Sequence, residues 1–194
     1  MEQITIYKFS GLSEEAQEKV LEYYRYKLTD VFGVDEIIGS LKAVFEHCYD
    51  VSMKDYSIGS YEYNIKIEFN SDDVAELSGV RAYTWLENNL FKYLRISKAE
   101  YLKNRKDYFR YGKSYRIGCI KECPLTGMCY DEDFLDSLKA DVLSDYTLKE
   151  AFENLAYVAS KLIQTEEEFQ SSDEYIAEHL EANEYRFLDS GNAI

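Results

Sequence analysis

The sequence is poor in the residues that break regular structure: it has one proline and nine glycines in 194 residues. This scarcity excludes a collagen-like chain and Pro/Gly-rich low-complexity segments. No apolar run approaches the roughly 20 residues that a membrane-spanning helix needs. The opening residues 1–6 also lack the basic and apolar regions of a secretory signal. We therefore expect a cytoplasmic protein whose four cysteines stay reduced.

Aromatic residues, by contrast, are abundant, with 19 Tyr and 10 Phe in a chain that is 46% hydrophobic. That much aromatic surface is not left in water, so an intrinsically disordered chain is excluded. The length suits one compact domain covering residues 1–194, with two small lobes as the alternative.

Acidic residues outnumber basic ones by 37 to 22, which gives a formal net charge of −15. The charge is unevenly distributed along the chain. Residues 1–91 carry −9, residues 92–121 carry +8, and residues 122–194 carry −14. Such asymmetry determines long-range fields and the choice of partner rather than the fold.

Hydrophobic periodicity predicts an α+β fold, with a small and mainly antiparallel sheet packed with several helices. The first and last strands are otherwise isolated, so we expect them to pair with each other. The expected strands lie near residues 2–9, 51–57, 61–69 and 184–188. The expected helices lie near residues 13–29, 35–48, 79–94, 97–111, 131–143, 147–169 and 172–183, with a short helical segment after residue 71 and a basic loop or helix segment at 92–121.

Three cysteines lie close together, at positions 119, 123 and 129. Structural zinc sites usually combine two C-x2-4-C pairs, whereas the spacings here are x3 and x5, so the pattern favours apolar cysteines over zinc ligands. The chain has no phosphate-binding P-loop, no G-x-G-x-x-G and no H-E-x-x-H. We therefore expect no catalytic residue, no metal and no cofactor, and a protein that is not an enzyme.

A carboxylate cluster follows the cysteines, formed by Asp131, Glu132, Asp133 and Asp136. Carboxylates in such a group are ligands for a divalent cation. Acids at the start of a helix also stabilise its N-terminus, and we favour this structural role.

Two interpretations apply to the acidic ends of the chain. The one that base rates favour is a solvated surface that keeps the protein soluble and monomeric. The other is a surface that binds a partner, because a nucleic-acid-binding protein presents Lys and Arg, and a rigid array of carboxylates competes for the same groove. The candidate partner-binding residues are Glu166, Glu167, Glu168, Asp173, Glu174, Glu178 and Glu181.

The basic segment 92–121 interleaves cations with aromatic residues, which is the composition of single-strand and RNA-binding surfaces. The interpretation we favour is that this segment packs against the protein's own acidic helices. Direct contact with nucleic acid is the alternative. Its candidate residues are Lys103, Arg105, Lys106, Arg110, Lys113 and Arg116.

Two longer motifs resemble a known family. Residues 9–21 read FSGLSEEAQEKVL, and residues 172–187 read SDEYIAEHLEANEYRF, with Gly191 after them. Both resemble the opening and the ending of a family of small acidic proteins encoded by bacteriophages and prophages. Residues 123–127, 134–136, 148–150 and 155–156 resemble the middle of its Gram-positive members.

The resemblance implies a mobile-element origin and carries over no catalytic residue. With the charge, it suggests a non-enzymatic inhibitor that binds a host defence nuclease, such as a CRISPR effector, at its basic nucleic-acid-binding site, in the manner of anti-CRISPR proteins or DNA mimics. An antitoxin-type protein that neutralises a toxin is the second hypothesis, and a nucleic-acid-contacting module using residues 92–121 is the third.

Overall fold

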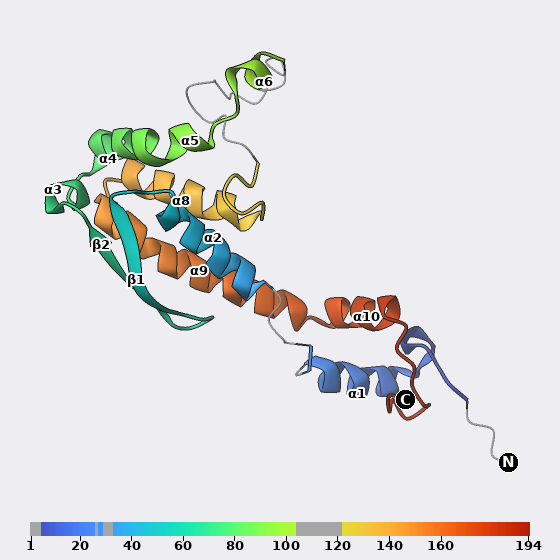
Figure 1. Ribbon diagram of the computed structural model, residues 1–194. Helices are drawn as coiled ribbons and strands as arrows, with labels where there is room; N and C mark the ends of the chain where they lie inside the picture. The colour runs from blue at the N-terminus through green and yellow to red at the C-terminus, as the bar shows by residue number, and fades with distance from the viewer. Residues whose placement is uncertain (1–4, 26, 29–32, 104–121) are drawn as a thin grey trace. The chain divides into compact units, whose positions relative to one another are not determined.

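The computed structural model describes residues 5–25, 27–28, 33–103 and 122–194 (Figure 1). The chain divides into two compact units. Unit 1 comprises Met1–Val34 and Ile163–Ile194, and unit 2 comprises Asp35–Leu162. The expectation of one domain over residues 1–194 stays a prediction. No helix in the described ranges is both long and apolar enough to cross a membrane.

Unit 1 is built from two short helices, α1 (Glu14–Arg25) and α10 (Asp173–Ala182), together with the 3-10 turn η1 (Phe9–Gly11). Both helices begin at a serine, as the sequence predicts. Ser13 Oγ accepts the N–H of Ala16 at 3.3 Å, and Ser172 Oγ accepts the N–H of Tyr175 at 3.2 Å. These bonds satisfy backbone donors that lack a partner at the start of a helix.

One apolar cluster holds unit 1 together, with Phe187 fully buried at its centre. The Tyr24 ring meets the rings of Tyr185 and Phe187 edge to face, with centroids 5.4 and 6.3 Å apart. Such edge-to-face contacts stabilise beyond the apolar area that they bury. The buried members of the cluster are Phe9, Leu12, Ala16, Val20, Tyr24, Ile176, Leu180 and Phe187.

The two ends of the chain pair through an antiparallel bridge between Tyr7 and Phe187. The N–H of each residue donates to the carbonyl oxygen of the other, at 2.9 and 3.0 Å. The predicted pairing is confirmed, but among the described residues it is an isolated bridge rather than strands over 2–9 and 184–188. The η1 turn ends the extended segment on one side, and a turn from Leu188 to Gly191 ends it on the other.

Unit 2 contains the predicted hairpin, made of β1 (Val51–Ile58) and β2 (Tyr63–Phe69). The strands are antiparallel, with Val51 opposite Phe69 and Ile58 opposite Tyr63. A bulge between Met53 and Asp55 leaves Lys54 without a register partner. The hairpin forms a two-stranded sheet, so the α+β class predicted from the sequence is confirmed.

Phe152 is a fully buried residue in the core of unit 2. Its ring lies 5.4 Å from that of Phe45 and 6.0 Å from that of Phe69, so one residue connects three elements. The hairpin tip is fixed by Ser160 Oγ, which donates to the carbonyl oxygen of Ser60 at 3.1 Å. The helices are α2 (Val34–Glu46), α3 (Asp72–Ala75), α4 (Gly79–Leu86), α5 (Lys92–Leu94), α6 (Lys98–Lys103), α8 (Tyr130–Leu143) and α9 (Leu148–Gln170), the last of which continues into unit 1.

The helix expected over residues 79–94 contains one irregular turn. A π-helical turn, η2 (Glu87–Phe91), lies between α4 and α5. Leu90 and Phe91 are adjacent in sequence and both are buried. A π-helical turn of this kind inserts one extra residue into the helical period.

Candidate functional site: the acidic surface of unit 1

The negative charge of the protein is concentrated in unit 1. This unit carries 15 Asp and Glu against 5 Lys and Arg, a net −10, although it is the shorter of the two. Unit 2 carries 22 acids against 17 bases, a net −5. Unit 1 is therefore the part of the chain with the stronger field for a cationic partner.

Helix α1 presents a row of carboxylates that was not among the predicted site residues. Glu14, Glu18 and Glu22 are exposed and four residues apart, which places them on one helical face about 6 Å apart along the axis. Within the described part of the chain, none of the three forms an ion pair. Glu15 pairs with Lys19 instead, at 3.1 Å. The spacing of four residues between these glutamates is visible in the sequence and would have predicted this row.

Helix α10 presents a second row, formed by Glu174, Glu178 and Glu181. They lie within about 60° of one another around the helix axis, at 100° per residue. Glu174 and Glu178 are exposed, whereas Glu181 accepts the N–H of Ser10 at 2.7 Å. Hydrogen bonds from the Ser10 side chain and backbone hold the pKa of Glu181 below its ordinary value. Glu181 therefore also joins η1 to α10.

Asp173 is an exposed acid that connects the two helices. Arg25 Nη2 donates to the Asp173 carboxylate, and Arg25 Nε donates to the carbonyl oxygen of Ser171 at 3.3 Å. Arg25 ends α1 and Asp173 begins α10, so this pair fixes the end of one helix to the start of the other.

The run Glu166–Glu168 does not share a face with the others. Three consecutive residues of a helix point over a 200° arc, so they cannot form one row. Glu166 accepts the side-chain amide of Gln170 at 2.9 Å, and Glu168 that of Gln164 at 2.8 Å. The structure thus groups Glu174, Glu178 and Glu181 and separates the α9 acids from them. Their predicted role in partner binding stays a prediction.

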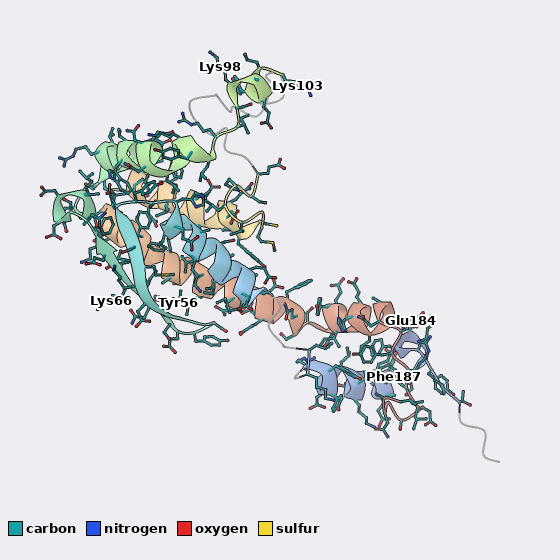
Figure 2. The ribbon with its side chains drawn as sticks, viewed as in Figure 1. Tyr56, Lys66, Lys98, Lys103, Glu184 and Phe187 are labelled. Carbon is teal, nitrogen blue, oxygen red and sulfur yellow. The ribbon has the colours of Figure 1, made fainter. Side chains whose placement is uncertain are left out.

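Of the residues predicted to contact nucleic acid, the structure describes one. Lys103 is exposed at the end of α6 (Figure 2). The other five, Arg105, Lys106, Arg110, Lys113 and Arg116, lie outside the described residues.

Asp131, from the predicted carboxylate cluster, is fully buried and has a structural role. Its Oδ2 accepts the N–H groups of Leu125 and Thr126 at 2.8 Å and that of Gly127 at 3.3 Å, and its Oδ1 accepts Thr126 Oγ1 at 2.8 Å. Burial alone would raise the pKa of this carboxyl, but the hydrogen bonds lower the pKa by more than burial raises it. The pKa of Asp131 is therefore below its ordinary value. Asp131, Glu132 and Asp133 lie in the first turn of α8, as expected of acids that stabilise a helix N-terminus, and Asp131 in addition organises the loop before α8.

The remaining acids of the cluster, Glu132, Asp133 and Asp136, are exposed. Burial and the charges of Asp136 and Glu132 raise the pKa of Asp133. Among the described residues, no three His, Cys, Asp or Glu side chains lie close enough together to hold a metal ion.

The described cysteines are free thiols: Cys48 is buried, Cys123 is half-buried and Cys129 is exposed. Burial, with a contribution from the charge of Asp50, raises the pKa of Cys48 to about 12. A thiol with such a pKa is not a nucleophile at neutral pH. Cys119 lies outside the described residues.

Comparison with known proteins adds no relative: no family model, no curated protein and no solved structure matches this chain. The resemblance to acidic phage proteins therefore stays a prediction carried by the motifs quoted above.

Proposed function

We propose that the protein acts without catalysis, by using unit 1 to bind the basic nucleic-acid-binding site of another protein. The residues of this proposal are Glu14, Glu18 and Glu22 on one exposed face of α1 and Glu174 and Glu178 on one exposed face of α10, and together they are called the acidic surface. The observation that carries the proposal is that these carboxylates stand in rows on two ordered helices. Figure 1 shows α1 and α10 side by side, and they share one apolar cluster.

Order in the helices matters because alignment of charges costs entropy. Long side chains lose about 0.5–1.5 kcal/mol each when an interface immobilises them, and flexible backbones lose more. Here the backbone cost is met during folding, through the cluster around Phe187 and the Arg25–Asp173 ion pair. Duplex DNA carries one negative charge per about 1.7 Å of its axis, and a protein that binds it presents a matching row of cations. The two rows of unit 1 are suited to the same cations.

The partner class is a nuclease of a bacterial defence system, such as a CRISPR effector, and the setting is the cytoplasm of a bacterial host. The charge of unit 1 and the resemblance to phage proteins support this choice. Such nucleases hold nucleic acid in positively charged channels. Binding there excludes the nucleic acid by competition for the same Lys and Arg side chains.

The experiment uses a guide-loaded CRISPR effector and a fluorescent target duplex, and measures whether the protein prevents duplex binding. We expect competition at low salt that weakens steeply from 50 to 300 mM salt, because exposed charges are screened. The triple variant Glu14→Lys, Glu18→Lys and Glu22→Lys should weaken competition by more than tenfold.

The matched control reverses three exposed acids of unit 2, through Asp72→Lys, Asp73→Lys and Glu76→Lys. It changes the net charge by the same amount but should leave competition within about threefold of the wild type. Equal losses in both variants would show that net charge, rather than the acidic surface, is responsible. Competition that salt does not change would show that an uncharged surface is responsible. Recovery of a small basic toxin from a lysate, in place of a nuclease, would favour the antitoxin hypothesis.

A further inference from the structure

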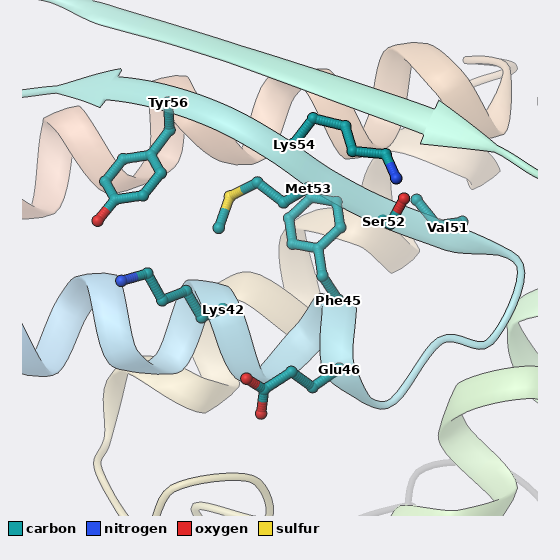
Figure 3. Close-up of a pocket in the computed structure, with 8 residues that line it drawn as sticks. All are labelled: Lys42, Phe45, Glu46, Val51, Ser52, Met53, Lys54 and Tyr56. Atoms are coloured by element: carbon teal, nitrogen blue, oxygen red, sulfur yellow. The ribbon is translucent and has the colours of Figure 1, made fainter.

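Unit 2 contains a groove that the acidic surface does not explain. It lies between α2 and β1 and encloses about 400 Å³ (Figure 3). This volume lies within the range of protein ligand sites. Its wall on the helix side is Lys42, Phe45 and Glu46, and its wall on the strand side is Val51, Ser52, Met53, Lys54 and Tyr56.

The groove follows the outer edge of β1. Five lining residues come from β1 and none from β2. Strand β2 pairs with the opposite, inner edge of β1. Figure 3 shows β1 running between β2 and the groove. In the described part of the chain the sheet has only these two strands, so the edge of β1 that faces the groove has no strand beside it. An unpaired edge beside a helix is the geometry that accepts an added strand.

The backbone of this edge is partly protected. The N–H of Val51 donates to the carbonyl oxygen of Cys48 at 3.3 Å, and the N–H of Tyr56 donates to the carboxylate of its neighbour Asp55 at 2.9 Å. The bulge at Lys54 interrupts the ladder between them. Bulges and lysines are devices that prevent an edge from pairing with a copy of itself. The Asp55 carboxylate is exposed, and the carbonyl oxygen of a bound peptide can replace it as the acceptor for the Tyr56 N–H.

The groove has an apolar floor and two lysines, Lys42 and Lys54. Phe45 is buried and Met53 half-buried, and they form the floor. Lys42 Nζ lies 5.0 Å from the centroid of the Tyr56 ring and forms no ion pair within the described ranges. Lys54 is already paired with Glu68, at 2.7 Å. Glu46 lies one helical turn beyond Lys42, on the same wall of the groove.

We propose that this groove binds an extended peptide of a partner protein, which pairs with the outer edge of β1. An apolar side chain of the peptide packs on Phe45 and Met53, and a carboxylate two residues away, on the same side of the strand, meets Lys42. The Lys54 bulge argues against a second copy of this chain as occupant, because pairing β1 with itself brings two bulges and two lysines into one ladder.

The probe is a phage-displayed library of random heptapeptides, selected against the full chain. We expect enrichment of sequences that alternate β-branched or aromatic residues with polar ones and carry an Asp or Glu. A synthetic peptide of the enriched sequence should bind at least tenfold more weakly to Lys42→Glu. The matched control Lys66→Glu, an exposed lysine of β2 outside the groove (Figure 2), should change its affinity less than twofold.

Two further measurements test strand pairing itself. N-methylation of peptide amides that face β1 should abolish binding, whereas N-methylation of the alternate amides should leave it intact. Asp55→Ala should tighten binding about threefold, because the Tyr56 N–H is then free to pair. No enriched peptide, equal binding to Lys42→Glu, or insensitivity to N-methylation would each overturn the proposal. A wild-type dimer in light scattering that Met53→Arg converts to monomer would identify a second copy as the occupant and overturn it as well.

Discussion

Unit 1 and unit 2 are stabilised by different kinds of contact. Unit 2 buries a broad apolar core in which Phe152 connects α2, β2 and α9. Unit 1 has one small cluster and supplements it with polar contacts at its helix ends, from Arg25 to Asp173 and from Ser10 to Glu181. It also carries twice the net negative charge on a shorter length of chain. The contacts that join the helix ends of unit 1 are therefore charged and partly exposed, so salt weakens the Arg25–Asp173 pair, and acid weakens the contact of Glu181.

The most direct way to break this comparison is to empty one core at a time. Phe152→Ala should cost unit 2 about 4 kcal/mol, because it removes a fully buried ring and leaves a cavity. Phe187→Ala is the matched change in unit 1. Amide hydrogen exchange should show lost protection first in the unit that carries the substitution. Uniform loss of protection over both units in either variant would show that they unfold as one.

Asp131→Asn tests whether unit 2 also depends on a charged contact. The variant keeps the size of the side chain but removes its charge, so the bonds from the N–H groups of residues 125–127 become neutral hydrogen bonds. We expect a loss of about 2 kcal/mol, because charge-assisted hydrogen bonds are roughly twice as strong as neutral ones. Urea denaturation measures it. A loss below about 0.5 kcal/mol, which is the size typical of a surface substitution, would mean that the loop does not need the carboxylate.

Much of the fold could be predicted from the sequence because periodicity reports on burial. The alternation over Tyr63–Phe69 and the helical repeat from Val34 to Glu46 both appear as elements. The extent of the pairing at the two chain ends could not be predicted, because it depends on turns at η1 and at Gly191 rather than on alternation. The π-helical turn η2 was also missed, since the apolar repeat of residues 79–94 does not differ from that of a regular helix.

The candidate sites were less predictable, because they depend on which side chains the fold uses internally. Glu181 and Asp173 look like free surface acids in the sequence, yet Ser10 and Arg25 bind them from the opposite end of the chain. Asp131 lies at the start of α8 as predicted, but its hydrogen bonds to the preceding loop could not be foreseen. The groove beside β1 could not be predicted from the sequence, because its two walls are separate segments that come together only when α2 lies along the edge of the strand.

Gly191→Ala tests the packing of the C-terminal turn of unit 1 against α1. Gly191 has φ of +87°, and an added Cβ would lie 3.0 Å from the carbonyl oxygen of Ala16 and 3.2 Å from Cγ2 of Val20. Both the backbone strain and the close contact oppose the substitution, so we expect a loss of about 1–2 kcal/mol. Thermal denaturation measures it, and Gly59→Ala is the control, because nothing lies within 4 Å of its added Cβ. Equal effects at the two glycines would mean that the C-terminal turn does not pack on α1.

Glu181→Gln is the smallest change and addresses pH. Because the folded-state pKa of Glu181 is lowered, its ionised form stabilises the folded state, and this contribution is complete above the ordinary glutamate pKa of about 4.3. It is lost as the pH falls through the folded-state pKa. The variant should therefore be less stable than the wild type at pH 7, by no more than about 1 kcal/mol, and the difference should vanish in acid. Hydrogen exchange of α10 as a function of pH measures this. A difference that persists in acid would mean that Glu181 acts through packing rather than charge.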